Sequence, residues 1–196
     1  PAITYGKLEN GFTYYIRENQ TPKDKVSIKL IIKAGSIMEE ENQLGLAHLL
    51  EHMAFNGSKN FPKRKIDEYM SSIGLNLGSH YNATTGFLET SYVYEIPTKN
   101  DKDVEIALKI LTDISKNLSF EPEAFERERK IVEEEWRRDI GGTQDYVNEF
   151  HKVLFKNSRL NERKPIGTLD IIQNFKYQDV IDYYQKWYRP QLMGLF

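Results

Sequence analysis

Residues 43–54 read Gln43-Leu44-Gly45-Leu46-Ala47-His48-Leu49-Leu50-Glu51-His52-Met53-Ala54. Most of these residues are apolar and are good helix formers, so the stretch predicts a largely buried helix. Positions i, i+3 and i+4 share one face of a helix. His48, Glu51 and His52 occupy these positions, and we therefore expect two imidazoles and one carboxylate to converge on one patch of the helix surface.

The H-x-x-E-H spacing of these three residues is suited to zinc chemistry. Two neutral imidazoles supply two ligands, and the carboxylate stays free to act on a bound water molecule. The order is the reverse of H-E-x-x-H and matches the inverzincin signature. The alternative is a pair of ordinary histidines on an amphipathic helix. Two histidines and a glutamate on one face of an apolar helix make that alternative the less favoured one.

The composition limits the classes of function. A chain of 196 residues suits one large domain or a piece of a larger protein. The net charge of -2 gives no basic surface of the kind that binds nucleic acid or anionic membranes. The chain has no cysteine, so a metal must be bound by histidine and carboxylate. The same absence is compatible with export in a bacterium, and a periplasmic or otherwise exported location is our expectation. No apolar run approaches the roughly 18 residues that a membrane span requires.

The rest of the sequence predicts strands and helices in mixed order. Strands are expected at 3–8, 12–17, 26–34, 75–81 and 88–96, with an Asn-Gly turn joining the first two. Helices are expected at 63–73, 101–118, 122–139 and 143–155, with one or two more in 170–187. This order predicts an α+β domain spanning residues 1–196, with a largely antiparallel sheet and helices packed mainly on one face.

Three shorter segments complete this prediction. Glu39-Glu40-Glu41 is a charge run and is interpreted as a solvated surface. Gly141-Gly142 is expected to break the helix that precedes it. The last residues, 188–196, are expected to lead into a strand that is cut short, so the domain would be truncated at this end.

A catalytic zinc site needs a third protein ligand besides the two histidines. The sequence offers these candidates: His80, His151, Glu126, Glu128, Glu133, Glu134 and Glu135. Neither histidine stands in a ligand pattern. Glu128 and Glu135 lie two helical turns apart and share a face with Val132, so they are expected to point inward. A buried carboxylate needs a metal or a charged partner. A surface helix with ion pairs four residues apart is the alternative, and this segment alone does not decide between the two.

Five segments, taken together and in order, resemble one protein family. They are Asn10-Gly11 with the following strand, Gly45 to Ser58, Asn82-Ala83-Thr84-Thr85 with Glu89-Thr90-Ser91-Tyr92, Glu128 to Arg137, and Trp187-Tyr188-Arg189-Pro190. They are similar to the opening hairpin, the zinc helix, an edge strand, the helix with the distal ligand and the approach to the last strand of the pitrilysin family. This family includes insulin-degrading enzyme, mitochondrial processing peptidase and bacterial zinc proteases, and the chain is nearest to the bacterial members.

The resemblance assigns roles to individual residues. It implies an N-terminal catalytic domain that binds one zinc ion per chain through His48, His52 and Glu135. It makes Glu51 the general base and gives Glu128 a supporting role beside the ligands. The separation between His52 and Glu135 is longer than the family leads us to expect, so Glu134 stays a second candidate for the third ligand.

The resemblance also implies a function and its partners. The chain would be part of a zinc-dependent endopeptidase that hydrolyses peptides or unfolded polypeptides. Asn82 and Ala83 would form the sheet edge to which an extended substrate adds as a strand, whereas a simple turn is the alternative for this segment. C-terminal domains of the same protein or a partner subunit would complete the enzyme, and the isolated fragment would have weak or no activity. A non-catalytic scaffold or processing subunit is the alternative function, and a structural zinc site with a fourth ligand is another.

Overall fold

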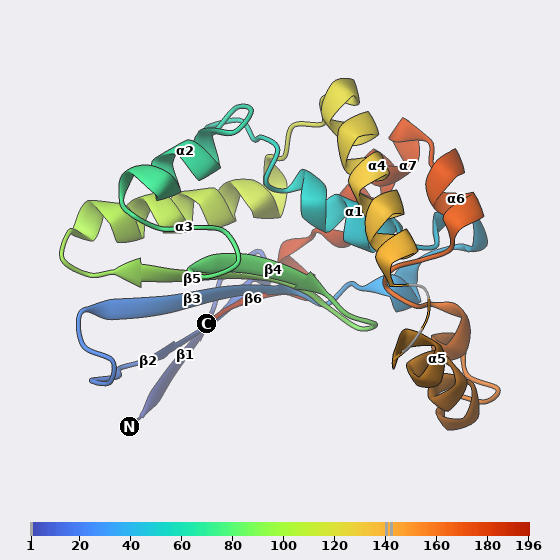
Figure 1. Ribbon diagram of the computed structural model, residues 1–196. Helices are drawn as coiled ribbons and strands as arrows, with labels where there is room; N and C mark the ends of the chain where they lie inside the picture. Colours follow the sequence, from blue (N-terminus) through green and yellow to red (C-terminus); the bar gives the residue numbers. More distant parts are fainter. Residues whose placement is uncertain (1, 140, 142) are drawn as a thin grey trace.

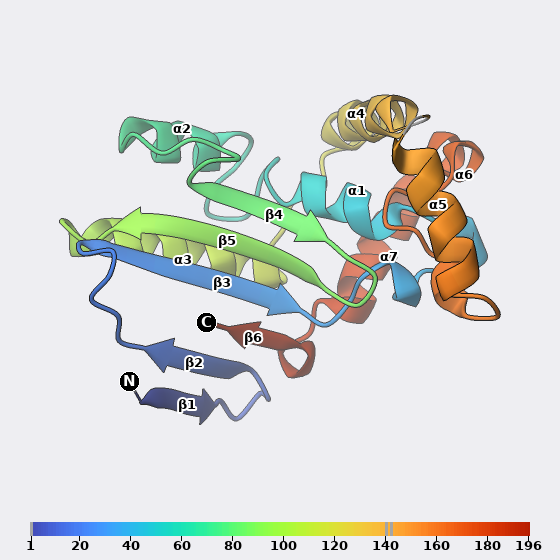
Figure 2. The ribbon, with the colours of Figure 1, turned by 60° about the horizontal axis from the view of Figure 1, so that its bottom comes forward.

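The computed structural model describes residues 2–139, 141 and 143–196. It contains a six-stranded sheet with the strand order β1-β2-β6-β3-β5-β4. Every neighbouring pair is antiparallel except β2 and β6, which run parallel. The strands, visible in Figure 2, are β1 (Ile3–Lys7), β2 (Thr13–Arg17), β3 (Lys25–Ile32), β4 (Tyr81–Thr85), β5 (Thr90–Pro97) and β6 (Met193–Leu195).

The helices pack mainly on one face of this sheet, as the sequence predicts. Figure 1 shows α2 and α3 over that face, with α1, α4, α6 and α7 grouped near one end of it and α5 farther out. The helices are α1 (Leu46–Met53), α2 (Lys65–Ser72), α3 (Asp101–Lys116), α4 (Pro122–Arg138), α5 (Thr143–Leu154), α6 (Leu169–Asn174) and α7 (Tyr177–Trp187). Within the described residues, none of these helices is long and apolar enough to cross a membrane.

The hydrophobic core lies between the sheet and the helices, with α1 inside it. Leu46, Leu49, Leu50 and Met53 of α1 are all fully buried. Each buried side chain of this size stabilises the fold by roughly 1.5–3 kcal/mol relative to an exposed one. α1 packs against α4, α7 and β4. The apolar residues that predict the helix are therefore the ones that fix its position in the domain.

The predicted hairpin and the central strand β3 are both present, but the strand predicted at 75–81 is wrong. β4 begins only at Tyr81, Leu77 makes an isolated bridge to Tyr81, and residues 78–80 form a turn with Gly78 at φ +85. The segment 82–85 falls between two strands in the pattern-based prediction, whereas the family resemblance makes it an edge strand, and it is the strand itself. Its pairing with β5 along the whole of β4 supplies backbone hydrogen bonds that a polar sequence does not predict.

The structure also refines the predictions for the C-terminal residues, for the end of α4 and for the charge run at 39–41. The last residues do form a strand, since β6 lies between β2 and β3 in the interior of the sheet. α4 ends at Arg138, and Gly142 of the predicted glycine break lies outside the described residues. The charge run at 39–41 is only partly solvated, because Glu39 is fully buried.

Candidate metal centre

Helix α1 places His48, Glu51 and His52 on its one polar patch. The helix begins after Gly45, which has a φ of +96 and lets the chain turn sharply into the first helical residue. The two imidazole rings lie edge to face, with their centroids 4.8 Å apart. Both histidine side chains are 18% exposed, so they are mostly buried but reach the surface of the domain. The predicted convergence of three functional groups on one patch is present.

Helix α4 brings Glu128 and Glu135 to this patch from about eighty residues farther along the chain. One oxygen of Glu135, Oε2, lies 3.7 Å from Nε2 of His48 and 3.5 Å from Nε2 of His52. Oε2 of Glu128 lies 3.4 Å from Nδ1 of His52. The two glutamates therefore contact the histidines differently. Glu135 lies near Nε2 of both rings, whereas Glu128 contacts Nδ1, the other ring nitrogen of His52.

His48, His52 and Glu135 form a group that fits a metal ion. Their ligand atoms all lie within 4.8 Å of one another. Ligand atoms at about 2.0–2.1 Å from a tetrahedral zinc would be separated by about 3.4 Å, close to the distances from the Glu135 oxygen to each histidine. Two imidazoles and one carboxylate are also a ligand set found in catalytic zinc sites. The geometry and the chemistry of these three residues thus both fit a zinc ion.

Burial and mutual charge set the protonation of the histidines. Burial, aided by the charge of His52, lowers the pKa of His48 to about 4, so this ring is neutral at pH 7 as a metal ligand must be. Burial acts in the same direction on His52, but its hydrogen bond to Glu128 and the charges of Glu51, Glu135 and Glu128 raise its pKa overall.

Glu51 is nearly buried, and burial raises its pKa to about 7. The charge of His52 and a hydrogen bond from Thr85 oppose this shift. Oγ1 of Thr85 donates to Oε2 of Glu51 over 3.4 Å. A carboxyl group with a pKa near 7 is suited to taking up and giving back a proton at neutral pH. Thr85 has no assigned role in the sequence analysis, although alternation along a strand places it on the same face as Ala83.

A cavity of about 560 Å³ opens beside the three ligand candidates. Phe55, Leu77 and Ile131 give it an apolar wall. Two basic side chains, Arg64 and Arg127, stand at its border. Its size and its mixed lining suit part of a peptide chain. The sequence analysis does not identify these lining residues, because they come from separate elements that only the fold brings together.

Strand β4 forms both an edge of the sheet and a wall of this cavity. It is last in the strand order, and Asn82 and Ala83 line the cavity. Asn82 is exposed, whereas Ala83 is buried. The alternative reading of this segment as a simple turn is wrong, since Asn82 pairs with Val93 and Ala83 with Tyr92 of β5.

The other candidates for the third ligand lie away from the centre. Glu134 is exposed and forms an ion pair with Arg137. Nδ1 of His80 accepts a hydrogen bond from the backbone of Asn76 at 3.2 Å. His151 packs against the aromatic rings of 87 and 155. Glu126 forms an ion pair with Arg129, and Glu133 forms one with Arg137 and accepts a hydrogen bond of 2.7 Å from Nε2 of Gln173 in α6. Among the described residues, only Glu135 joins the two histidines in a group that could hold a metal.

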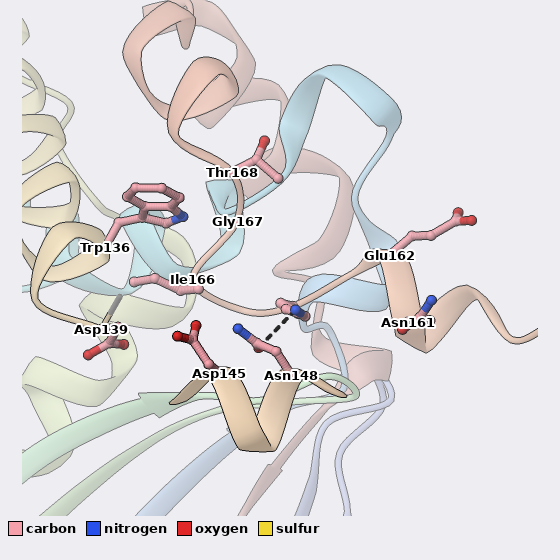
Figure 3. A pocket seen from close by; sticks show the side chains of 10 residues that line it. Trp136, Asp139, Asp145, Asn148, Asn161, Glu162, Ile166, Gly167 and Thr168 are labelled. Atoms are coloured by element: carbon pink, nitrogen blue, oxygen red, sulfur yellow. Dashed lines mark hydrogen bonds between the residues drawn. The ribbon is translucent and has the colours of Figure 1, made fainter. Parts of the chain in front are cut away.

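A second cavity, of about 440 Å³, lies between the end of α4, the start of α5 and the segment 161–168 (Figure 3). Asp139 and Asp145 border it on one side. Nζ of Lys164 donates a hydrogen bond of 2.8 Å to Oδ1 of Asn148 in its wall. None of its lining residues belongs to the histidine group. Of these two cavities, only the first is therefore lined by the candidate metal ligands His48, His52 and Glu135.

Comparisons with known proteins agree with this arrangement. The sequence model of the family described as Insulinase (Peptidase family M16) matches residues 14–163. Among curated relatives, the probable zinc protease PqqL of Haemophilus influenzae is 38% identical over 195 residues, which is 100% of this chain and 21% of that protein. The probable zinc protease PqqL of Escherichia coli is 36% identical and matches 96% of this chain and 20% of its own length.

A solved structure shows the same fold. The crystal structure of the periplasmic protease PqqL from Escherichia coli superimposes with a TM-score of 0.95 at 35% sequence identity. The match covers 98% of this chain and 21% of that one. The chain thus spans about a fifth of the length of the relatives it matches.

Proposed function

The chain belongs to the insulinase family of peptidases, and from this membership together with the histidine–glutamate centre we propose that it is the catalytic domain of a zinc-dependent endopeptidase. The observation that carries the proposal is the convergence of both Nε2 atoms on one oxygen of Glu135, at 3.7 and 3.5 Å. His48, His52 and Glu135 would hold one zinc ion per chain. When bound, zinc supplies a Lewis acid that polarises a peptide carbonyl and lowers the pKa of a water molecule.

The residues around the centre would transfer the proton and orient the reacting groups. Glu51 is the general base: it accepts a proton from the attacking water and returns it to the leaving amine. Its near burial and its pKa of about 7 support this role, because both protonation states are accessible near neutral pH. Thr85 orients the Glu51 carboxylate from the neighbouring strand. Glu128 holds Nδ1 of His52, which directs Nε2 toward the centre.

The substrate class follows from the position of β4. An exposed edge strand offers unpaired amides and carbonyls to an extended chain, and strand addition does not depend on sequence. Asn82 and Ala83 are the residues of this edge that border the cavity. We therefore assign peptides or unfolded polypeptides as substrates. A folded protein would have to expose an extended segment first.

The rest of the enzyme and its location are part of the same proposal. Because the relatives are about five times as long as this chain, other domains of the same protein or a partner subunit would complete the substrate site. The chain alone is then expected to bind zinc but to hydrolyse peptides weakly or not at all. The periplasm is the proposed location, supported by the periplasmic protease whose structure it resembles.

Two observations weigh against the alternative functions. A scaffold subunit would not need a base and a complete ligand set together, and all four side chains stand at the centre here. A structural zinc site would need a fourth protein ligand. Among the described residues the group that could hold a metal has three members, which leaves one position for water or substrate.

Zinc content and hydrolysis test the proposal with three variants. The wild-type chain should contain about one zinc ion, and Glu135→Gln should lose it or bind it far more weakly. Glu134→Gln is the matched control, because it makes the same change at the adjacent, exposed position and should retain zinc. In the full-length protein, Glu51→Gln should retain zinc and lose hydrolysis of an unfolded model peptide.

Each outcome has a distinct meaning. Zinc retained by Glu135→Gln but lost by Glu134→Gln would move the third ligand to Glu134. Undiminished hydrolysis in Glu51→Gln would remove the proposed base. Vigorous hydrolysis by the 196-residue chain alone would contradict the need for further domains.

A further inference from the structure

A buried carboxylate from outside the helix holds the N-terminus of α1. Glu39 is 0% exposed. Its Oε2 accepts a hydrogen bond of 3.0 Å from the amide of Gly45, and its Oε1 accepts one of 2.9 Å from the amide of Ala47. The first amides of a helix lack partners within it and carry partial positive charge, so a carboxylate is favourable there. The residue before α1 is a glycine without a capping side chain, and the first turn therefore depends on Glu39.

The position of Glu39 is itself fixed by a buried arginine. Arg163 is 2% exposed, and its Nε donates a hydrogen bond of 3.1 Å to the backbone carbonyl oxygen of Glu39. Its guanidinium also forms an ion pair with Glu41. On the other side, a Cβ added to Gly45 would lie only 3.1 Å from Cα of Gly167, so the two backbones pack closely. The beginning of α1 is thus held on two sides.

The two histidines of the centre are oriented by different means. Nδ1 of His52 lies 3.4 Å from Glu128. Nδ1 of His48 is buried and has no hydrogen-bond partner among the residues that the structure describes. A metal-binding histidine is usually oriented by a hydrogen bond from its other ring nitrogen. Without a hydrogen bond at Nδ1, the direction of the His48 ring depends on its backbone, which follows directly on Ala47, and on its edge-to-face contact with His52.

We propose that Glu39 is a positioning residue for the metal centre. By holding the amides of Gly45 and Ala47, it fixes the turn of α1 that carries His48, and so aims a ring whose Nδ1 has no hydrogen-bond partner among the described residues. This inference rests on the proposed function, because it presupposes a metal at the three-residue centre. It gives a buried glutamate, distant from the reacting atoms, a measurable effect on metal binding.

The test compares zinc affinity in the wild-type chain, Glu39→Gln and Glu41→Gln. Glutamine keeps the volume of Glu39 but offers one acceptor oxygen to two amides. Glu41→Gln is the matched control, since it makes the same substitution two residues away, on an exposed side chain, and removes the ion pair with Arg163. Competition with a chromophoric chelator should show a zinc dissociation constant raised about tenfold in Glu39→Gln. In Glu41→Gln the constant should stay within about twofold of wild type.

A spectroscopic readout separates positioning from general stability. Co²⁺ bound in place of zinc has visible absorption bands that depend on ligand geometry, and Glu39→Gln should change their intensity or energy. A residue with only a structural role would lower the unfolding temperature and leave the cobalt spectrum of the folded protein unchanged. Circular dichroism identifies the temperature at which all three proteins are folded, and the measurements are made there.

The possible results are distinguishable. Wild-type zinc affinity and cobalt spectrum in Glu39→Gln would overturn the inference and leave the proposed function intact. A wild-type chain that binds no zinc would overturn both. If Glu39→Gln does not fold, Glu39→Asp takes its place, because it keeps both oxygens on a shorter side chain. A weakened affinity with an altered cobalt spectrum in this variant supports the inference, and wild-type behaviour overturns it.

Discussion

Zinc binding should release protons from the chain in a number set by the burial of Glu51. Burial raises the pKa of this carboxyl to about 7, so at pH 6 the metal-free protein carries about 0.9 proton on it. Burial lowers the pKa of His52, but its hydrogen bond to Glu128 and the neighbouring carboxylates raise it overall, so this ring also carries bound proton at pH 6. His48, with a pKa of about 4, contributes almost nothing.

The sign of the effect follows from the charge of the metal. A divalent cation stabilises the ionised carboxylate of Glu51 and requires His52 to be neutral, so both groups lose protons when zinc binds. We expect about 0.9 proton to be released from Glu51 per zinc ion at pH 6, with a further release from His52. As the pH rises above 7, Glu51 is already ionised in the metal-free protein, and its share of the release falls toward zero. Apparent zinc affinity should therefore increase with pH through this range.

Isothermal titration calorimetry measures this number directly. Zinc is titrated into the chain at pH 6 in two buffers with different ionisation enthalpies, and the slope of the observed enthalpy gives the protons released. Glu51→Gln should release about 0.9 proton fewer than wild type at pH 6 and nearly the same number at pH 8.5. Glu134→Gln, exposed and outside the centre, should match wild type at both values. Equal release by Glu51→Gln and wild type at pH 6 would refute the reasoning.

Three further substitutions test the surroundings of the centre. Glu128→Gln should lower zinc affinity about tenfold, because it weakens the hydrogen bond that orients His52; chelator competition measures this. Asp113→Ala should reduce the free energy of unfolding by about 3 kcal/mol in urea denaturation, because the buried hydroxyl of Ser58 and two donors of Asn60 lose their acceptor, and a loss below about 1 kcal/mol would contradict this. Gly167→Ala should cost at least about 2 kcal/mol in the same assay, since its Cβ would lie 2.2 Å from a backbone oxygen at a φ of +76.

The sequence predicts α1 well because its information is local. The spacing of His48, Glu51 and His52 fixes their common face as soon as the segment is helical, and the apolar residues between them make it helical and buried. The inward direction of Glu135 is also predictable from its two-turn separation from Glu128. Helix geometry favours Glu128 and Glu135 as the inward pair without deciding it, and the family resemblance selects Glu135 as the ligand. The distances require the packing of α4 on α1.

The errors have a common physical origin in contacts between distant parts of the chain. β4 contains Asn82, Ala83 and two threonines, a short polar segment whose strand conformation comes from pairing with β5. Glu39 stands in a charge run that favours a solvated surface, yet it is buried because the amides at the start of α1 need an acceptor. Thr85 reaches Glu51 only because β4 packs on α1. No local pattern contains these partners.

Helix α1 explains why the functional centre depends on such distant contacts. An isolated helix of eight residues is marginal in water, because its few hydrogen bonds do not offset the conformational entropy lost in nucleating the helix. The helix that carries His48 and His52 is therefore held by what surrounds it: a carboxylate at its N-terminus, α4 along its polar face and β4 beside Glu51. Each of these neighbours also contributes a group to the centre or aims one. The packing that makes α1 a helix is the packing that brings the proposed ligands, the proposed base and the proposed substrate edge to one place.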